Sequence, residues 1–384
     1  MQHFYFDHNA TTPIAPEVLE TVVSCLGQVY GNASSIHHFG QAAKQRLEAA
    51  RRQVASLIHA SPPEVVFTGG GTEADNLAIL GVFRAESRRP AHCITSAIEH
   101  PAVLEPAAVL EREGVAVTRV PVGAGGTVNP EDVRRALRPE TVLVSIMHAN
   151  NETGAVQPIA EIARIAGEAG VLLHVDGVQA IGKIPVDVAA LGVDLYSISA
   201  HKLYAPKGVG ALYVRKGTRL APTVFGGHHE RDRRPGTENV PGIAALGAAA
   251  ELAGRTLAAE SARLAALRDR LETAVLDRIS GAGVNGARWN RTPNTSNIYF
   301  DGVDGEAMVI ALDLRGFAVS TGSACSSGAI TPSHVLTAMG LSADRARATL
   351  RFSLGRSNTA EQVDALADAL AASVAHLRRI SVHA

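Results

Sequence analysis

The chain has few cysteines, nearly balanced charges and no long apolar run. Three cysteines in 384 residues, without metal-ligand spacing, argue against a disulfide framework and fit a reducing compartment. A formal net charge of −1 gives no electrostatic reason to expect nucleic acid or a membrane surface as a partner. No apolar run approaches the roughly 20 residues of a membrane span, and the N-terminus lacks the features of a signal peptide. We therefore expect a cytoplasmic protein without a metal site.

What the chain does contain is a large apolar fraction arranged in an alternating pattern. Apolar residues make up 46% and charged residues 19%, which predicts a folded α/β protein with a sizeable core. Short β-branched runs alternate with helical patterns, which predicts a mainly parallel sheet with helices on both faces. The seven candidate strands cover residues 64–68, 92–96, 115–121, 141–148, 171–176, 195–199 and 210–214.

The pattern changes after residue 240, where a long helix rich in Ala, Leu and Arg is expected over about residues 243–279. The remainder mixes candidate strands at 296–300 and 349–353 with helices at 306–314 and 360–378. This predicts a smaller α+β domain that the N-terminal segment joins. We place the large domain at residues 13–255 and the small domain at residues 1–12 and 256–384.

Two candidate strands deliver an acid and an amine. Asp176 ends one apolar strand, and Lys202 follows the next one along the chain. Pyridoxal phosphate needs a lysine for its Schiff base and an aspartate that keeps its ring nitrogen protonated. Taken singly, Asp176 is better explained as a helix cap and Lys202 as a solvated strand end. Together with the motifs below, they predict a pyridoxal-phosphate site.

A glycine-rich turn precedes a candidate helix. The run from Gly69 to Thr72 follows the first candidate strand, so its backbone N–H groups and the helix N-terminus can bind a phosphate. The spacing matches neither a Walker A motif nor a dinucleotide fingerprint, and a plain turn capped by Thr72 is the alternative. Ser199 and His201, beside Lys202, would add phosphate donors.

Further polar residues lie where candidate strands end. His100 follows the second strand, where an imidazole can stack on a cofactor ring and relay protons, although a lone histidine is usually only a satisfied polar residue. Asn151 follows the fourth strand, and Gln179 lies one turn after Asp176. Since the carboxyl ends of parallel strands meet at one edge, these residues together indicate a binding site.

Two residues in the last third of the chain suggest substrate chemistry. Cys325 lies in a run of small residues flanked by glycines, which offers little to bury it and predicts an accessible thiol. Cys25 and Cys93 lie in apolar-periodic segments and are expected to be buried. Arg351 projects from a short apolar strand, where a clamp for a substrate carboxylate and a surface ion pair are equally good interpretations.

With these residues assembled, the chain closely resembles the cysteine desulfurases among fold-type I pyridoxal-phosphate enzymes, which are class V aminotransferase-like. The resemblance runs nearly end to end and rests on the motifs at residues 7–13, 70–73, 145–152, 174–176, 199–202, 236–239 and 351–356. The long small-residue segment around Cys325 is similar to that of the subgroup serving general and nitrogenase iron–sulfur assembly.

The resemblance implies a reaction in which L-cysteine becomes L-alanine and its sulfur is captured as a persulfide on Cys325. It also implies that Lys202 carries the cofactor and that Asp176 pairs with the ring nitrogen. The other implied cofactor contacts are His100 on the ring, Gln179 at the ring hydroxyl, Asn151 beside cofactor and substrate, and Gly71, Thr72, Ser199 and His201 around the phosphate. Thr237 would reach in from the second subunit of a homodimer, and Arg351 would bind the substrate carboxylate with help from Asn32.

The sulfur acceptor stays open: an iron–sulfur scaffold, a tRNA-modifying enzyme and a thiocarboxylate carrier are all compatible with the resemblance. A selenocysteine lyase, another aminotransferase-like enzyme and a non-catalytic sulfur carrier are the alternative functions. The chain departs from the family pattern at Ala33, where proline is usual, at Gly177, where alanine is common, and at His228 and His229, in a stretch that is glycine-rich in relatives. It also ends soon after Arg379, without the longer tail that contributes to scaffold docking in relatives.

Overall fold

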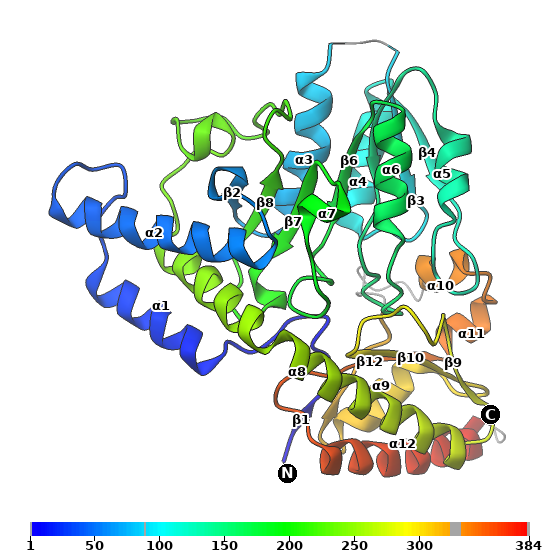
Figure 1. The fold of residues 1–384 in the computed structure, drawn as a ribbon. Helices are drawn as coiled ribbons and strands as arrows, with labels where there is room; N and C mark the ends of the chain where they lie inside the picture. Colours follow the sequence, from blue (N-terminus) through cyan, green and yellow to red (C-terminus); the bar gives the residue numbers. More distant parts are fainter. Residues whose placement is uncertain (1, 88–89, 323–331, 382–384) are drawn as a thin grey trace.

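The computed structural model describes residues 2–87, 90–322 and 332–381 (Figure 1). Its largest sheet has seven strands in the order β2-β8-β7-β6-β5-β3-β4. β8 pairs antiparallel with β2 and β7, and the other neighbouring pairs are parallel, so the predicted mainly parallel sheet is confirmed. The strands are β2 (Val65–Thr68), β3 (His92–Ser96), β4 (Ala116–Val120), β5 (Thr141–Ser145), β6 (Leu172–Asp176), β7 (Leu195–Ser199) and β8 (Gly210–Val214).

Helices cover both faces of this sheet (Figure 1). Alternate side chains of β2 show this division: Val65 and Phe67 join a cluster with α2, α6 and α8 (Val240–Arg278), whereas Val66 joins a cluster with α3 and α4. Strands buried on both faces read as continuous apolar runs, as the sequence does here. The helices before α8 are α1 (Pro16–Gln28), α2 (His38–Leu57), α3 (Gly71–Ala85), α4 (Pro101–Arg112), α5 (Pro130–Ala136), α6 (Ile159–Glu168) and α7 (Val188–Leu191).

A second, smaller part of the molecule contains the chain's beginning and end. Its three-stranded sheet has the order β12-β10-β9 with antiparallel pairs, and β1 pairs in parallel with β11. The N-terminal segment therefore pairs with the small part. The elements are β1 (Phe4–Tyr5), β9 (Ala282–Val284), β10 (Thr295–Phe300), α9 (Gly305–Asp313), β11 (Phe317–Ala318), α10 (His334–Ala338), α11 (Ala343–Arg347), β12 (Thr349–Ser353) and α12 (Ala360–Ser381).

One long helix, α8 (Val240–Arg278), connects the two parts. Its first half, up to Leu252, packs into the cluster under the large sheet. Its second half contributes Leu264, Leu271 and Val275 to a separate cluster in the small part. Each part thus has its own apolar cluster, while the domain bounds stay a prediction. No helix among the described residues is long and apolar enough to span a membrane.

Candidate active site

A cavity of about 1620 Å³ lies between the carboxyl ends of the large sheet's strands and the small part. Most of the candidate residues line it: Gly71, Thr72, His100, Asn151, Asp176, Gln179, Ser199, His201, Lys202 and Arg351. Asn32, between α1 and α2, and Thr237, before α8, are exposed and do not line this cavity. Cys325 lies outside the described residues. Gly322 and Pro332, the described residues on either side of it, both line the cavity.

The glycine-rich turn packs tightly at one end of the cavity. A Cβ added to Gly71 would lie 2.9 Å from Cγ2 of Val178 and 3.2 Å from Cβ of Ser199, so a side chain does not fit there. The helix α3 begins at Gly71 with Gly70 as its N-cap, so the alternative that Thr72 caps the helix is wrong. The first N–H groups of a helix have no intrahelical acceptor, and here they stand beside Ser199. This arrangement fits a phosphate group.

Asp176 ends β6 as a buried carboxylate. Its Oδ1 accepts a hydrogen bond from the N–H of Val178 at 2.9 Å, while Oδ2 accepts none from the described residues. Burial, followed by the nearby carboxylate of Asp75, raises the pKa of Asp176 to about 7. A protonated ring nitrogen at Oδ2 would offset both effects, because an opposite charge favours the ionised carboxylate.

Lys202 lies at the end of the short 3-10 turn Ala200–Lys202, directly after β7. Its Nζ donates hydrogen bonds to the carbonyl oxygens of Asn9 and, at 2.6 Å, Ala10. Burial and, next, the charge of Arg351 lower the pKa of Lys202 to about 8, against the opposing effects of Asp7 and Asp176. The interpretation of Lys202 as a solvated strand end is therefore wrong. An amine with a lowered pKa is more readily available as a nucleophile.

His100 and Gln179 are held by different partners. His100 is the N-cap of α4, where its Nδ1 accepts from the N–H of Ala102 at 3.1 Å, and burial lowers its pKa. Gln179 donates to the carbonyl oxygen of Asn9 at 3.0 Å and accepts from Nζ of Lys183. Asn9 and the buried Lys183 were not found from the sequence. Asn9 lies within the motif at residues 7–13, while Lys183 carries only the i,i+4 spacing from Gln179 as a signal.

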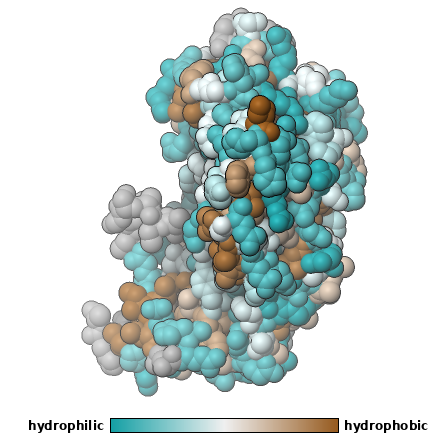
Figure 2. Space-filling model, turned by 90° about the vertical axis from the view of Figure 1, so that its left-hand side faces the viewer, coloured by the Kyte–Doolittle hydropathy of each residue, from teal (hydrophilic) through white to brown (hydrophobic). Residues whose placement is uncertain are grey.

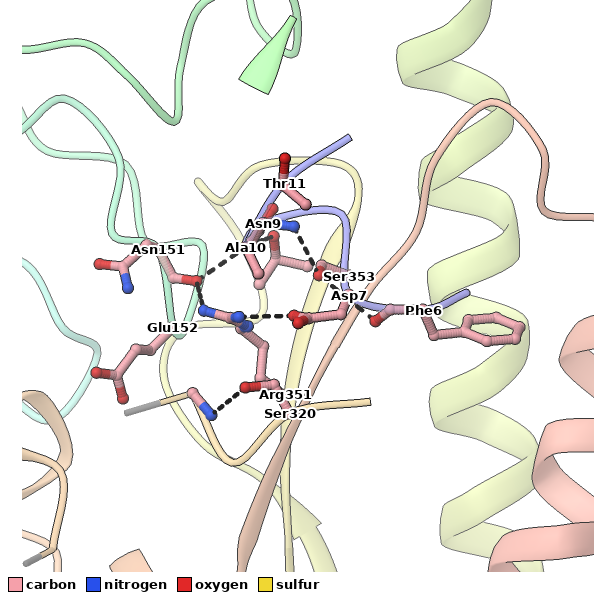
Figure 3. A network of polar contacts seen from close by, with 12 residues as sticks. Phe6, Asp7, Asn9, Ala10, Thr11, Asn151, Glu152, Ser320, Arg351 and Ser353 are labelled. Atoms are coloured by element: carbon pink, nitrogen blue, oxygen red, sulfur yellow. Dashed lines mark hydrogen bonds and ion pairs between the residues drawn. The ribbon is translucent and has the colours of Figure 1, made fainter. Parts of the chain in front are cut away.

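Arg351 extends from β12 into the cavity wall (Figure 3). Its Nη2 lies 2.7 Å from Oδ1 of Asp7, and its Nη1 donates to the carbonyl oxygen of Asn151 at 3.1 Å. The side chain is only 5% exposed, so the ion pair is not a surface pair as one interpretation had it. The buried Nε has no hydrogen-bond partner. Arg351 therefore brings a positive charge to the cavity wall, which favours a bound carboxylate.

Two buried acidic residues near the cavity, Glu99 and Glu152, were not identified as site residues from the sequence. Burial raises the pKa of Glu99 to about 8 and also raises that of Glu152. Glu152 lines the cavity and accepts from Oγ of Ser333 at 2.6 Å, which fixes the beginning of α10. Glu99 accepts from the N–H of Met147 at 3.0 Å. Glu152 is the last residue of the motif at residues 145–152, and Glu99 directly precedes His100.

The departure at Gly177 has a packing reason. A Cβ at this position would lie 1.8 Å from Cε1 of Tyr196. Tyr196 is fully buried, and its hydroxyl lies 2.9 Å from Nδ1 of His148. Alanine is therefore excluded as long as Tyr196 occupies this place. The departure at His228 instead lies on the surface, where the imidazole Nδ1 is 2.5 Å from Oδ1 of Asp232.

The cysteines that the structure describes behave as predicted. Cys25 and Cys93 are both free and buried. Burial raises the pKa of Cys93 to about 12, which keeps this thiol protonated and unreactive at neutral pH. Neither residue lines the cavity.

Taken together, the cavity residues fit pyridoxal phosphate. A helix N-terminus without a side-chain cap can hold the phosphate, and a buried carboxylate with one free oxygen can pair with the ring nitrogen. An amine of lowered pKa lies in the same cavity. These are the protein groups that this cofactor requires.

Comparison with known proteins agrees with this geometry. The profile described as "Aminotransferase class-V" matches residues 4–366. The chain belongs to the aminotransferase class-V family. The cysteine desulfurase IscS of Dictyoglomus turgidum is 49% identical over 377 residues, which cover 98% of this chain and 96% of the relative. Class-V enzymes of this kind depend on pyridoxal phosphate, so the predicted cofactor is confirmed.

Solved structures of class-V relatives share the whole fold. A structure titled "NifS-like protein" has a TM-score of 0.92 and 37% sequence identity, covering 98% of this chain and 100% of the other. A structure titled "SspA in complex with cysteine" has a TM-score of 0.80 and 37% identity, covering 91% of this chain and 98% of the other. The predicted α/β architecture with a smaller second part is confirmed.

Proposed function

We propose that this chain is a pyridoxal-phosphate-dependent cysteine desulfurase, which converts L-cysteine to L-alanine and passes the sulfur on through Cys325. The observation that carries the proposal is that Lys202, Asp176 and the residues flanking the Cys325 segment line one cavity. The near-complete similarity to a relative named cysteine desulfurase supports this reaction. A relative of the same fold solved in complex with cysteine supports the substrate.

Bound pyridoxal phosphate supplies an electron sink that activates the amino acid attached to it. Lys202 would hold the cofactor and then carry a proton on its Nζ, a role that its lowered pKa supports. Asp176 would keep the proton on the ring nitrogen through its free Oδ2. His100 would cover the ring. Gly71, Thr72, Ser199 and His201 would hold the phosphate through backbone N–H and side-chain donors.

Cys325 would act as the sulfur acceptor within the enzyme. Its thiolate attacks the sulfur of the bound L-cysteine, so the substrate's carbon–sulfur bond breaks while a sulfur–sulfur bond forms. The carbon skeleton takes up a proton and leaves as L-alanine. The persulfide on Cys325 then passes its outer sulfur to an acceptor protein, for which we propose a component of iron–sulfur cluster assembly. The relatives named IscS support this acceptor class.

The enzyme would work as a homodimer. Exposed apolar side chains gather on one face of the molecule, which carries α1 and the segment after it (Figure 2). They include Leu19, Val23, Leu26, Tyr30 and Phe39, with exposed fractions from 48% to 72%. An apolar surface of this kind supports burial against a second subunit. Thr237 is exposed and outside its own chain's cavity, which agrees with the prediction that it serves the partner's cofactor.

The test follows sulfur and alanine separately. Wild-type protein given L-cysteine, without an α-keto acid, should release alanine and carry a reductant-sensitive extra sulfur on the peptide containing Cys325. Lys202→Ala should release no alanine, and Cys325→Ala should bind L-cysteine but transfer no sulfur. Cys25→Ala serves as the control and should behave as wild type because this buried thiol lies outside the cavity.

Three results would contradict the proposal. Normal sulfide release by Cys325→Ala, or the extra sulfur on Cys93, would show that Cys325 is not the sulfur acceptor. A strict need for an α-keto acid would instead identify an aminotransferase of the same family.

A further inference from the structure

The ion pair between Asp7 and Arg351 is built into the wall of the cavity from two distant parts of the chain. The residues are 344 positions apart, and both line the cavity. Asp7 lies just after β1, where its backbone bridges to Ser353 of β12, the strand that also carries Arg351. Figure 3 shows the carboxylate and the guanidinium pointing toward each other. Neighbouring strands therefore hold the two charges in a fixed arrangement.

Each member of this pair keeps an unused hydrogen-bonding atom. Oδ1 of Asp7 accepts from Arg351, whereas Oδ2 accepts no hydrogen bond from the described residues. The Asp7 side chain is 19% exposed and lines the cavity. On Arg351, the buried Nε has no acceptor. The pair thus places one negative and one positive charge side by side in the cavity wall.

Asp7 also lies within electrostatic reach of Lys202. Its carboxylate raises the pKa of the Lys202 amine, while Arg351 lowers it. Lys202 donates to the carbonyl oxygens of Asn9 and Ala10, which follow Asp7 in the chain. When the carboxylate of an amino acid binds Arg351 and its amino group approaches Lys202, the amino group would lie close to the carboxylate of Asp7.

We propose that Asp7 is a specificity-determining residue that binds the α-ammonium group of the incoming amino acid while Arg351 binds its carboxylate. This rests on the proposed function, in which an α-amino acid enters and another leaves. The Asp7–Arg351 pair is complementary to a zwitterion. A carboxylate without an amino group would bring a negative charge beside Asp7 with nothing to compensate it.

The test compares two ligands that differ only in the amino group, L-alanine and propionate. Borohydride reduction of the holoenzyme fixes the cofactor on Lys202, so that binding reports recognition without exchange at the cofactor. Dissociation constants come from ligand-observed NMR titrations. In the wild-type protein, L-alanine should bind at least about tenfold more tightly than propionate, as expected for one charge-assisted contact. In Asp7→Asn, the ratio should fall to about two or less, because L-alanine binds more weakly and propionate more tightly.

The control is Asp344→Asn, which removes a surface carboxylate that is 91% exposed and should leave the ratio unchanged. Cofactor content and thermal unfolding show whether Asp7→Asn is folded. If Asp7 only supported Arg351, both ligands would weaken alike and the unchanged ratio would overturn the proposal. A wild-type ratio near one would also overturn it, even if the variant did not fold. Failure of the proposed function is seen separately, as a wild-type protein that makes no alanine from L-cysteine.

Discussion

The two halves of the cavity are built in different ways. The sheet half comprises Gly71, Thr72, His100, Asp176, Ser199 and Lys202, each placed at or just after the end of a strand of the large sheet. The joining half comprises Asp7, Asn9, Asn151 and Arg351, in which Asp7 and Arg351 are 344 positions apart. The pairing of strands within the large sheet sets the positions of the residues in the sheet half. The second half exists only when the N-terminal segment, the large part and the small part have come together.

Asn9 shows how closely the joining half is tied. Its Nδ2 donates to the carbonyl oxygen of Asn151 at 3.0 Å and to Oγ1 of Thr295 at 2.9 Å. Its Oδ1 accepts from Nζ of Lys183 and Nδ2 of Asn294, both at 3.0 Å. One buried amide thus connects both parts of the molecule. Changes in the sheet half should therefore affect chemistry with little loss of stability, whereas changes in the joining half should affect both.

The largest effect is expected for Asp176→Asn in the sheet half. An amide is nearly the same size but cannot hold the ring nitrogen protonated, so alanine release should fall by about 10³-fold, equivalent to ~4 kcal/mol. The free energy of unfolding of the apoprotein should not fall, because the buried carboxylate is itself costly. The matched control is Asp194→Asn, just before β7, where the carboxylate accepts from the N–H of Leu173 at 2.8 Å. Equal activity losses in the two variants would show that Asp176 has only a structural role.

A smaller effect, of another kind, is expected for Asn9→Ala in the joining half. The change removes one acceptor each from the buried Lys183 and Asn294, which keep only Oε1 of Gln179 and the carbonyl oxygen of Leu354. Together with the lost donors to Asn151 and Thr295, this should cost ~3 kcal/mol of unfolding free energy. Activity should fall as well, because the Asn151 carbonyl that contacts Arg351 loses its second partner. Urea denaturation and alanine release measure the two losses, with the exposed Gln41→Ala as control. Lost activity at unchanged stability would remove the contrast between the halves.

The smallest effect concerns pH. Burial lowers the pKa of His148 to about 4, against 6.5 as its ordinary value. The unfolded chain therefore binds a proton at this residue below pH 6.5, and the folded chain does so only below about pH 4. The contribution of neutral His148 to the free energy of unfolding is fully present above pH 6.5 and is lost as the pH falls toward 4. Between pH 7 and 5, wild-type apoprotein should lose ~2 kcal/mol more unfolding free energy than His148→Gln. Urea denaturation of both proteins at the two pH values measures this, and parallel losses would contradict the shifted pKa.

The sequence predicts the sheet half well because its signals are local. Apolar runs identify the strands, and polar residues at their ends must meet at one edge of a parallel sheet. Apart from Asn151, which follows a strand, the joining half carries no such local signal. Whether Arg351 binds a ligand or an internal partner depends on how the N-terminal segment docks against β12. The position of Asp7 beside Arg351 results from that docking and cannot be seen in the local sequence. The same holds for Gly177, because the need for glycine there comes from the ring of Tyr196 on the neighbouring strand.

The helix α8 has a mechanical consequence. Its 39 residues make a rod about 58 Å long that is clamped in one apolar cluster near Leu252 and in the other from Leu264 onward. A rod held at both ends resists hinge motion, so the two walls of the cavity can change their spacing only as far as the helix flexes or rolls. Gly254 lies between the two clusters, and among the described residues a Cβ added there would meet only Cδ1 of Leu57, at 3.8 Å. Any bending of α8 should therefore be easiest near Gly254, which does not line the cavity.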